Sequence, residues 1–259
     1  MLTTAATYNI ISANLPRTLS ATAAKPQVAR ETAYYLANIE NVKSIEELFG
    51  DDRLFSYAMR AFGLQDMTYA KAFMRKVLTE GIDDKDAFAN KLTDRRYREF
   101  AEAFDFARYG SATTIFDRTR QGTVDRYVRQ TLEEDAGRQN EGVRLALYFE
   151  RKATSITSPM SILGDPALLK VAQTALNLPV TMSLLDIDRQ AQMISDRLDV
   201  DDLQDSDKLS AFLHRFASLW DAENPAATAT SPVLFSQPRE LGLGADLLAS
   251  LQNLKLGGR

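Results

Sequence analysis

The stretch "LFGDDRLFSYAMRAFGL" at residues 48–64 has a second copy in the chain, "ILGDPALLKVAQTALNL" at residues 162–178. The copies align without a gap at an offset of 114 residues, and the match extends back to residue 30. Nine of the 35 aligned positions are identical, where roughly two would be expected between sequences of ordinary composition. The identical pairs are Arg30/Arg144, Tyr34/Tyr148, Ser44/Ser158, Gly50/Gly164, Asp51/Asp165, Leu54/Leu168, Ala58/Ala172, Ala61/Ala175 and Leu64/Leu178.

Each copy predicts a turn followed by a capped helix. Gly50 and Gly164 stand where the chain would turn sharply after one helix. Asp51 and Asp165 would then cap the next helix through their carboxylates. The matched leucines and alanines would form the buried stripe of that helix, with alanine allowing a neighbouring helix to approach closely. Because none of the repeated side chains is chemically distinctive, the repeat indicates architecture rather than catalysis.

Helical periodicity continues along most of the chain. Ser44 followed three residues later by Glu47 is a capping-box pattern, and Gly63 and Gly81 stand where helices would end. No run of five or more residues alternates convincingly between apolar and polar side chains, so strands are not expected to be prominent. We therefore predict an all-α, multi-helical fold of two pseudo-repeated helical units that pack together.

The predicted organisation follows the repeat. We expect a mobile N-terminal segment over residues 1–24, a first helical repeat unit over 25–110, a connecting helix over 111–141, a second repeat unit over 142–224, and a linker with an amphipathic C-terminal segment over 225–259. The polar run "EEDAGRQNEG" at residues 133–142 is either a helix that crosses solvent or a break between the halves. The two ends either dock on their own domain or fray, and the alternative is a segment that folds only against a partner.

Composition excludes several kinds of site. The 259 residues include no cysteine, which rules out disulfides, thiolate nucleophiles and cysteine-ligated zinc. The net charge is -4 and both signs are interleaved, so the basic footprint of a nucleic-acid-binding protein is not expected. Residues 1–24 lack the apolar core of a secretory signal, and no window approaches the ~20 apolar residues of a membrane span.

Motifs that could carry chemistry are incomplete. The acidic run "DVDDLQDSD" at residues 199–207 lacks the glycine and the bidentate glutamate of a calcium loop. The run "GLGADLL" at residues 242–248 has neither the preceding strand nor the third glycine of a dinucleotide fingerprint. The single histidine, His214, has no recognisable nucleophile partner. Glu133 and Glu134 are adjacent, but their polar flanks give no sign of a pocket. We expect no catalytic residue, no metal ligand and no cofactor.

Four strings of the sequence resemble a known protein family. They are "YYLANIENVKS" at residues 34–44, "DDRLFSYAMRAFGLQDMTYAKAFMRKVL" at 51–78, "FANKLTDRRYREFAEAFDFARYG" at 88–110 and "VDRYVRQTLEEDAGRQNEGVRLALYFERKA" at 124–153. The resemblance is to an uncharacterised domain-of-unknown-function family of bacterial proteins encoded in flagellar gene clusters, and it covers about residues 26–224. It implies a flagellum-associated role, and it supplies no catalytic residue to carry over.

The function expected from the sequence is therefore that of a non-enzymatic, flagellum-associated protein that acts through protein–protein contacts, as a structural component or an export or assembly factor. The alternatives are a cytosolic adaptor or regulator of flagellar genes or motility, and an enzyme with a carboxylate, arginine and tyrosine site between the two halves. The location would be the cytoplasm, or the flagellum after export without a cleaved signal.

The expected partners are other flagellar or export proteins, with no nucleic acid and no membrane span, and a homo-oligomer is left open. Two groups of side chains are candidates for these contacts. The C-terminal segment carries a leucine stripe at helical spacing, and the first half carries arginines and aromatics beyond what packing needs. The candidate residues are Leu247, Leu248, Leu251 and Leu254 in the stripe, and Arg95, Arg96 and Tyr97 in the first half.

Overall fold

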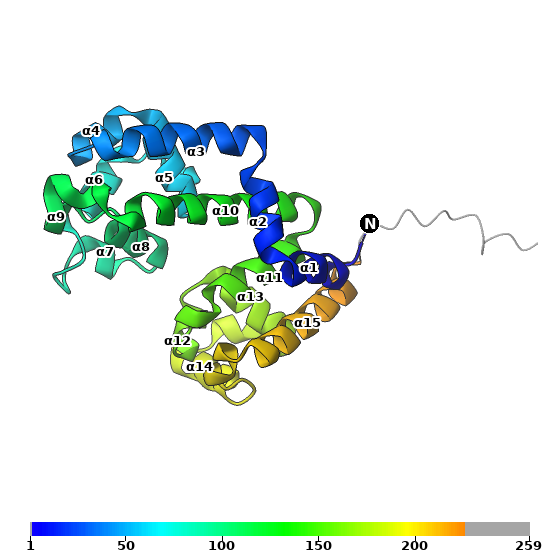
Figure 1. Ribbon diagram of the computed structural model, residues 1–259. Helices are drawn as coiled ribbons and strands as arrows, with labels where there is room; N and C mark the ends of the chain where they lie inside the picture. Colours follow the sequence, from blue (N-terminus) through cyan, green and yellow to red (C-terminus); the bar gives the residue numbers. More distant parts are fainter. Residues whose placement is uncertain (1, 226–259) are drawn as a thin grey trace, which may run out of the picture. The chain divides into compact units, whose positions relative to one another are not determined.

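The computed structural model describes residues 2–225, and all the regular structure in that part of the chain is helical (Figure 1). Among those residues there is no strand, so the all-α, multi-helical class predicted from the sequence is confirmed. The predicted leucine stripe, Leu247, Leu248, Leu251 and Leu254, lies outside the described residues.

The helices follow one another with short connections. The α-helices are α1 (Thr4–Ala13), α2 (Leu15–Ala23), α3 (Pro26–Asn38), α4 (Ile45–Gly50), α5 (Asp52–Ala61), α6 (Lys71–Glu80), α7 (Phe88–Lys91), α8 (Arg95–Ala103), α9 (Phe106–Tyr109), α10 (Gln121–Gln139), α11 (Glu141–Lys152), α12 (Pro159–Leu163), α13 (Pro166–Ala175), α14 (Ile187–Ser195) and α15 (Ser206–Glu223). Short 3-10 helices stand between them: η1 (Ile39–Asn41), η2 (Gln65–Met67), η3 (Gly110–Ile115), η4 (Asp117–Thr119), η5 (Ala153–Ser155), η6 (Val180–Leu184) and η7 (Val200–Gln204).

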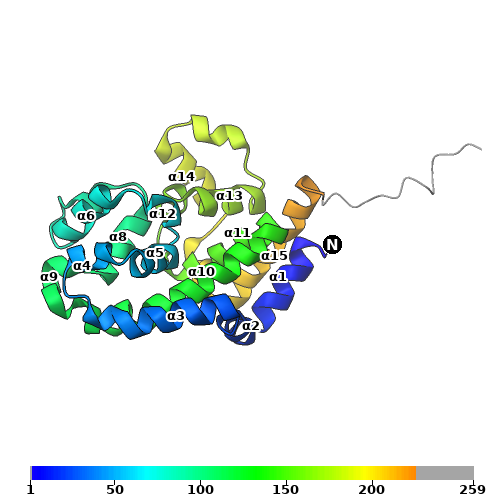
Figure 2. The same ribbon diagram turned by 90° about the horizontal axis from the view of Figure 1, so that it is seen from above.

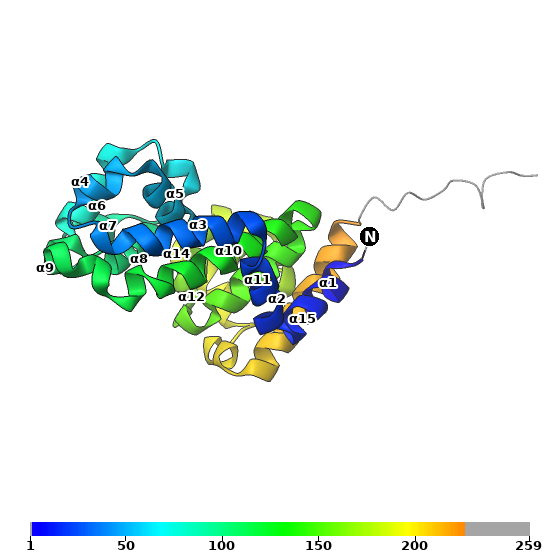
Figure 3. The same ribbon diagram turned by 45° about the horizontal axis from the view of Figure 1, so that its top comes forward.

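The N-terminal residues differ from the expectation of a mobile segment over residues 1–24. They form α1 and α2, and α1 lies against α15 and α11 while α2 packs on α10 (Figures 2 and 3). The start of α1 is held by Asp221 of α15, whose carboxylate accepts the N–H of Thr4 at 3.0 Å. Tyr8 is buried and meets the ring of His214 edge-on at 6.0 Å. The segment is packed because its cap and its inward tyrosine both find partners on α15.

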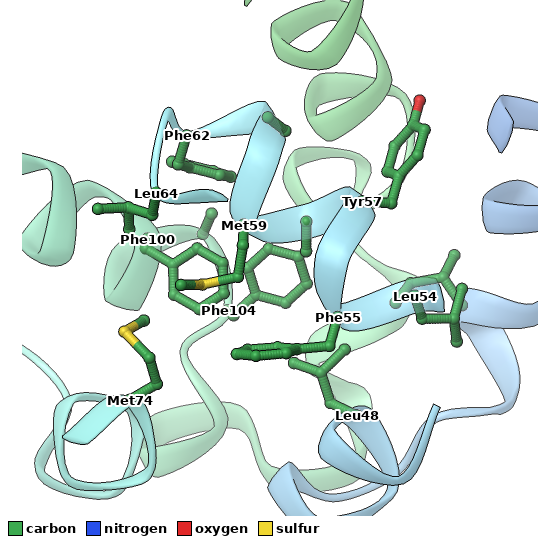
Figure 4. Packing of buried hydrophobic residues seen from close by; sticks show 14 of the residues in the cluster. Leu48, Leu54, Phe55, Tyr57, Met59, Phe62, Leu64, Met74, Phe100 and Phe104 are labelled. Carbon is green, nitrogen blue, oxygen red and sulfur yellow. The ribbon is translucent and has the colours of Figure 1, made fainter. Parts of the chain in front are cut away.

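Two hydrophobic cores form, one for each half of the described chain. The first draws on α3 to α10, and in Figure 4 the side chains of Met59, Phe100 and Phe104 lie together at its centre. The Phe100 and Phe104 rings stack with centroids 4.9 Å apart, and Phe62 meets Phe100 edge-on. The second core draws on α11 to α15 and takes in Tyr8 of α1. Each half therefore buries its own apolar side chains.

Element bounds recur at the offset of 114 residues. Helix α5 spans 52–61 and α13 spans 166–175, while η1 spans 39–41 and η5 spans 153–155. The residues matched between the two copies thus occupy the same positions in corresponding elements. The wider prediction, that two helical units pack as a pseudo-symmetric pair, stays a prediction.

A tyrosine–aspartate pair holds the start of α5 and, in the same way, the start of α13. Oδ1 of Asp51 accepts the backbone N–H groups two and three residues ahead, both at 3.0 Å, and Oδ2 accepts the hydroxyl of Tyr34 at 2.7 Å. Asp165 accepts the corresponding N–H groups at 2.9 and 3.2 Å and the hydroxyl of Tyr148 at 2.6 Å. The tyrosines match between the copies because each ties the preceding long helix to the cap.

The turns that end α5 and α13 are also alike, although their residues differ. Gly63 and Asn177 have φ angles of 69° and 50°, and in each turn the following N–H donates to a carbonyl oxygen five residues back at 2.8 Å. Asparagine is the residue that most readily replaces glycine in this left-handed position. By contrast, Gly50 and Gly164 do not have positive φ, and a Cβ on Gly50 would meet nothing within 4 Å. The two glycines do stand where consecutive helices meet as predicted, α4 and α5 in one copy and α12 and α13 in the other, but neither uses the left-handed conformation that favours glycine.

The connection between the halves contains a break. The expected 111–141 connection begins with the 3-10 helices η3 and η4, and its long helix is α10, which ends at Gln139. Asn140 then caps α11 by accepting the N–H of Gly142 at 2.9 Å. Of the two alternatives for the polar run at 133–142, the structure has the break. The polar centre of α10 does not cross solvent either, because Arg129 and Glu133 are buried.

The first prediction concerns Gly142, which lies where α11, α15 and α1 meet. An added Cβ would stand 2.4 Å from Cδ1 of Trp220 and 2.8 Å from Cγ2 of Thr4. Gly142→Ala is therefore expected to lower the free energy of unfolding in urea, followed by circular dichroism, by about 1–3 kcal/mol. Gly50→Ala is the matched control and is expected to leave stability unchanged or to raise it slightly. Equal losses in the two variants would contradict this account of Gly142.

The second prediction concerns the two caps. Asp51→Ala and Asp165→Ala are each expected to lower the free energy of unfolding by about 1 kcal/mol, because two backbone N–H groups lose their acceptor. Glu102→Ala, an exposed change on α8, is the control and is expected to have little effect. Urea unfolding of the three variants checks this, and a cap variant as stable as the control would argue against the role of that cap.

A third prediction is the pH dependence that Asp51 contributes. Burial acts to raise the pKa of Asp51, but the N–H of Leu54, the hydroxyl of Tyr34 and the N–H of Arg53 together hold it below its usual value. A carboxylate with a lowered folded-state pKa stabilises the protein above its unfolded pKa of about 3.9. That contribution is lost as pH falls through the lower folded value. The stability difference between wild type and Asp51→Asn should therefore shrink below about pH 4; a difference that stays constant from pH 7 to pH 2 would contradict it.

Candidate functional site

A cleft of about 530 Å³ lies where residues of both halves meet α10. Its first-half wall comes from residues 62–66 and the start of α8, and its second-half wall comes from α11, α12 and the start of α13. Gln130 and Glu133 of α10 also line it. The expectation that the carboxylates at 133 and 134 are not associated with a pocket is wrong, because Glu133 lines this cleft.

Glu133 is a buried carboxylate in the cleft, 1% exposed. Its oxygens accept Nε of Arg129 at 3.0 Å and both Nε and Nη2 of Arg151, at 2.8 and 2.7 Å. Burial acts to lower the pKa of Arg151, but the Glu133 carboxylate raises it above its usual value, so Arg151 stays a cation. A buried charge is tolerated when it is paired and hydrogen-bonded in this way. Glu133 therefore joins α10 to α11.

Glu134 makes the matching contact with the first half. Its carboxylate accepts Nη2 of Arg60, on α5, at 2.6 Å. Between the two carboxylates lies Gln130, whose Nε2 donates to Glu134 at 3.2 Å and whose Oε1 accepts Nη2 of Arg151 at 3.3 Å. Adjacent carboxylates of one helix thus bind an arginine from each half.

The rim of the cleft is charged, and several of its charges are paired. Asp94 binds Arg96 at 2.7 Å, and Glu99 accepts Nζ of Lys152 while it pairs with Arg126 at 3.7 Å. Burial acts to raise the pKa of Asp94, but its hydrogen bonds with Arg96 hold it below the usual value. The lowered pKa is that of an ion-paired carboxylate, so these groups hold the surrounding elements in place.

Beside the cleft is a second cavity of about 650 Å³, which we call the basic hollow. Its cations are Lys85, Arg95 and Arg98, and all three are exposed. The remaining lining residues are Ile82, Asp83, Ala89, Asn90, Leu92 and Thr93. Thr93 and Arg95 line the cleft as well, so the two cavities share an edge at the start of α8.

The three contact residues predicted in the first half have different surroundings. Arg95 is exposed at the edge of both cavities. Arg96 is engaged within the fold, because it binds Asp94 and donates to the carbonyl of Gly63. Tyr97 is half-buried, with its ring edge-on to Phe73 at 5.0 Å. The structure therefore places only Arg95 of the three where a partner could reach the whole side chain.

A second exposed feature was missed from the sequence. Val180 and Leu184 of η6 are 73% and 86% exposed, and Ile187 at the start of α14 is 57% exposed. Leu185 between them and Met160 of α12 are also exposed. We call these five side chains the exposed apolar surface. The run "VTMSLLDI" at residues 180–187 shows its apolar content, but only the fold shows that most of it faces outward.

Within residues 2–225 no group of three or more histidine, cysteine, aspartate or glutamate side chains could hold a metal ion. No helix in the same range is long and apolar enough to span a membrane.

A fourth prediction tests the buried carboxylate. Glu133→Gln is expected to lower the free energy of unfolding by about 3 kcal/mol, because the buried Arg129 would keep only Glu150 as a counterion and Arg151 would lose the carboxylate that binds it. Glu134→Gln is the matched control on the next, more exposed position and is expected to cost about 1 kcal/mol. Urea unfolding checks both, and equal losses would mean that burial does not set the strength of the Glu133 contacts.

Comparison with known families identifies the family of this chain. The model of the family described as "Protein of unknown function (DUF1217)" matches residues 61–209. The crystal structure of protein AGR_C_984 from Agrobacterium tumefaciens is similar, with 48% sequence identity, a TM-score of 0.79, and coverage of 85% of this chain and 94% of that chain. No curated protein matches. The resemblance to an uncharacterised family is thereby confirmed at that level, and the chain belongs to the DUF1217 family of proteins of unknown function.

Proposed function

We propose that this chain is a non-enzymatic protein that acts by binding other proteins of the flagellar system, as a structural component or an export or assembly factor. The flagellar part of the proposal is supported by the resemblance of residues 34–44, 51–78, 88–110 and 124–153 to a family encoded in flagellar gene clusters. The protein-binding part is carried by one observation, the exposed apolar surface on η6, α14 and α12.

A comparison of the two halves supports a missing partner at this surface. Helix α6 follows α5 in the first half and packs against α4, α7, α8 and α9. Helix α14 follows α13 in the second half, and its main contact is with α12. In the first half the chain itself supplies α7, α8 and α9, which pack on α6. In the second half Val180, Leu184, Leu185 and Ile187 face outward, while Met182 among them is buried. Large outward-facing apolar side chains that cluster mark interaction surfaces.

The occupant that fits best is an amphipathic helix of a partner protein. In the first half, helices pack on α6, which follows α5 as α14 follows α13. Leucine side chains also suit the apolar stripe of a helix laid against them. Asp186 and Asp188 flank the apolar side chains, are exposed, and form no ion pair with the described part of the chain. Basic residues beside the partner's apolar stripe would complement these two carboxylates.

The cleft supports a structural role for the ionisable groups between the halves. A general base that works near neutral pH needs a raised carboxyl pKa. In the cleft, the pKa of Asp94 is lowered by its partner Arg96, and Glu133 is held between two arginines. Such groups are engaged in ion pairs, which favours the non-enzymatic proposal over an active site between the halves.

The test replaces the chromosomal gene in motile cells of the source organism with a variant carrying both Leu184→Asp and Leu185→Asp. Both side chains are exposed, so the protein is expected to fold, while two charges within an apolar contact should abolish partner binding. Swimming in soft agar and recovery of the tagged chain in a purified flagellar fraction are the measurements. Both are expected to fall relative to wild type.

The matched control is Thr181→Asp, an exposed change on η6 that adds a charge outside the exposed apolar surface. It is expected to swim normally. A folded double variant that swims like wild type, and is recovered in the flagellar fraction in the same amount, would contradict the proposed contact. If the wild-type chain were absent from flagella and from the exported proteins, yet were needed for swimming, the cytosolic adaptor would replace the flagellar component as the function.

A further inference from the structure

We propose that the basic hollow binds a segment of a partner protein that carries several carboxylates. The proposal rests on the proposed function in one respect, that the occupant is a protein, but it uses a surface separate from the exposed apolar surface. Lys85 comes from the connection between α6 and α7, and Arg95 and Arg98 come from α8. The chain thus brings three cations from two elements to one cavity.

These three cations differ from their neighbours because they lack counterions. Arg96 on the same helix is held by Asp94. Within the described part of the chain, Lys85, Arg95 and Arg98 have no carboxylate within ion-pair distance. The acidic side chain that lines the hollow, Asp83, is itself paired with Arg108 at 3.6 Å. The positive charge at the rim is therefore available to an acidic ligand.

The size and floor of the hollow favour a peptide segment over a single small anion. Its volume of about 650 Å³ falls in the range of roughly 300–1,000 Å³ typical of sites for ligands of many atoms. Ile82, Ala89 and Leu92 add apolar surface among the cations. A segment in which apolar side chains alternate with acidic ones would match both the cations and the apolar lining. Its spaced carboxylates could reach Arg95 and Arg98, which are one helical turn apart.

The start of α8 argues against phosphate as the ligand. Phosphate is commonly bound by the free N–H groups at a helix N-terminus. Here the Asp94 carboxylate already accepts the N–H of Arg96 at 3.0 Å, so a negative charge occupies that position. Recognition at the hollow is left to the side chains of Lys85, Arg95 and Arg98, which suits carboxylates spaced along a peptide.

The attraction is local, because the whole chain has a net charge of -4. An acidic ligand is repelled on average by the protein and is attracted where cations without counterions gather, as they do at the hollow. At 0.1 M salt, exposed charges interact over about 10 Å. Binding should therefore depend on the three named cations and weaken as salt is raised.

The experiment titrates the purified full-length chain with a peptide of about ten residues in which glutamate and leucine alternate, followed by calorimetry at low and moderate salt. The variant Lys85→Ala, Arg95→Ala, Arg98→Ala is expected to bind about tenfold more weakly. The matched control Arg189→Ala, Arg197→Ala, Arg215→Ala removes the same charge from three exposed arginines that line neither cavity. It is expected to bind like wild type, and circular dichroism verifies that both variants are folded.

Two results would overturn the proposal. The first is equal weakening in the two triple variants, which would mean that only net charge matters. The second is inorganic phosphate binding at the hollow more tightly than the peptide and displacing it, which would make the site one for phosphate. The titration does not involve flagella, so its failure leaves the swimming result for Leu184 and Leu185 intact. A swimming defect of the Leu184→Asp, Leu185→Asp variant likewise says nothing about peptide binding at the hollow. The two proposals can therefore fail separately.

Discussion

The arrangement of the helices around α10 depends on the carboxylate of Glu133. It is buried, and the cost of burying it is offset only while Arg129 and Arg151 both reach its oxygens. That requirement fixes how α10 and α11 lie against each other on either side of the break at Asn140. The neighbouring Glu134 fixes α5 in turn through Arg60. The cleft above these contacts follows from the same constraint, because its two walls belong to the elements that the arginines hold.

Much of the fold was predictable because its signals are local. The caps at Asp51 and Asp165 depend on residues within one turn, and the periodic apolar positions of α5 and α13 depend on the helix alone. The equivalence of Gly63 and Asn177 was not visible as an identity, although the two residues take the same backbone conformation. The docking of α1 and the burial of Glu133, the first residue of "EEDAGRQNEG", depend on distant partners, such as Asp221 for Thr4 and Arg151 for Glu133. A polar run with such partners looks the same in sequence as a solvated one.

The candidate sites were predictable in smaller part. Arg95 is exposed, which the sequence favours because a run of arginines on a helix is usually solvated. Lys85 lies ten residues away in a connection, and only the fold brings it to the same hollow. Leu184 and Leu185 were missed for the opposite reason, since adjacent leucines ordinarily predict a core. In each case the sequence did not show which other helices pack near the residue.

Trp220 gives the close contact at Gly142 a practical consequence. It is the single tryptophan of the chain, and its indole lies on α15 against α11 and the start of α1, with the Lys170 ammonium 5.7 Å from the ring centroid. Its ultraviolet emission therefore depends on the second core and on the N-terminal helix. The first core contains no indole among its side chains. The natural protein thus carries an intrinsic optical label that distinguishes melting of one half from melting of the other.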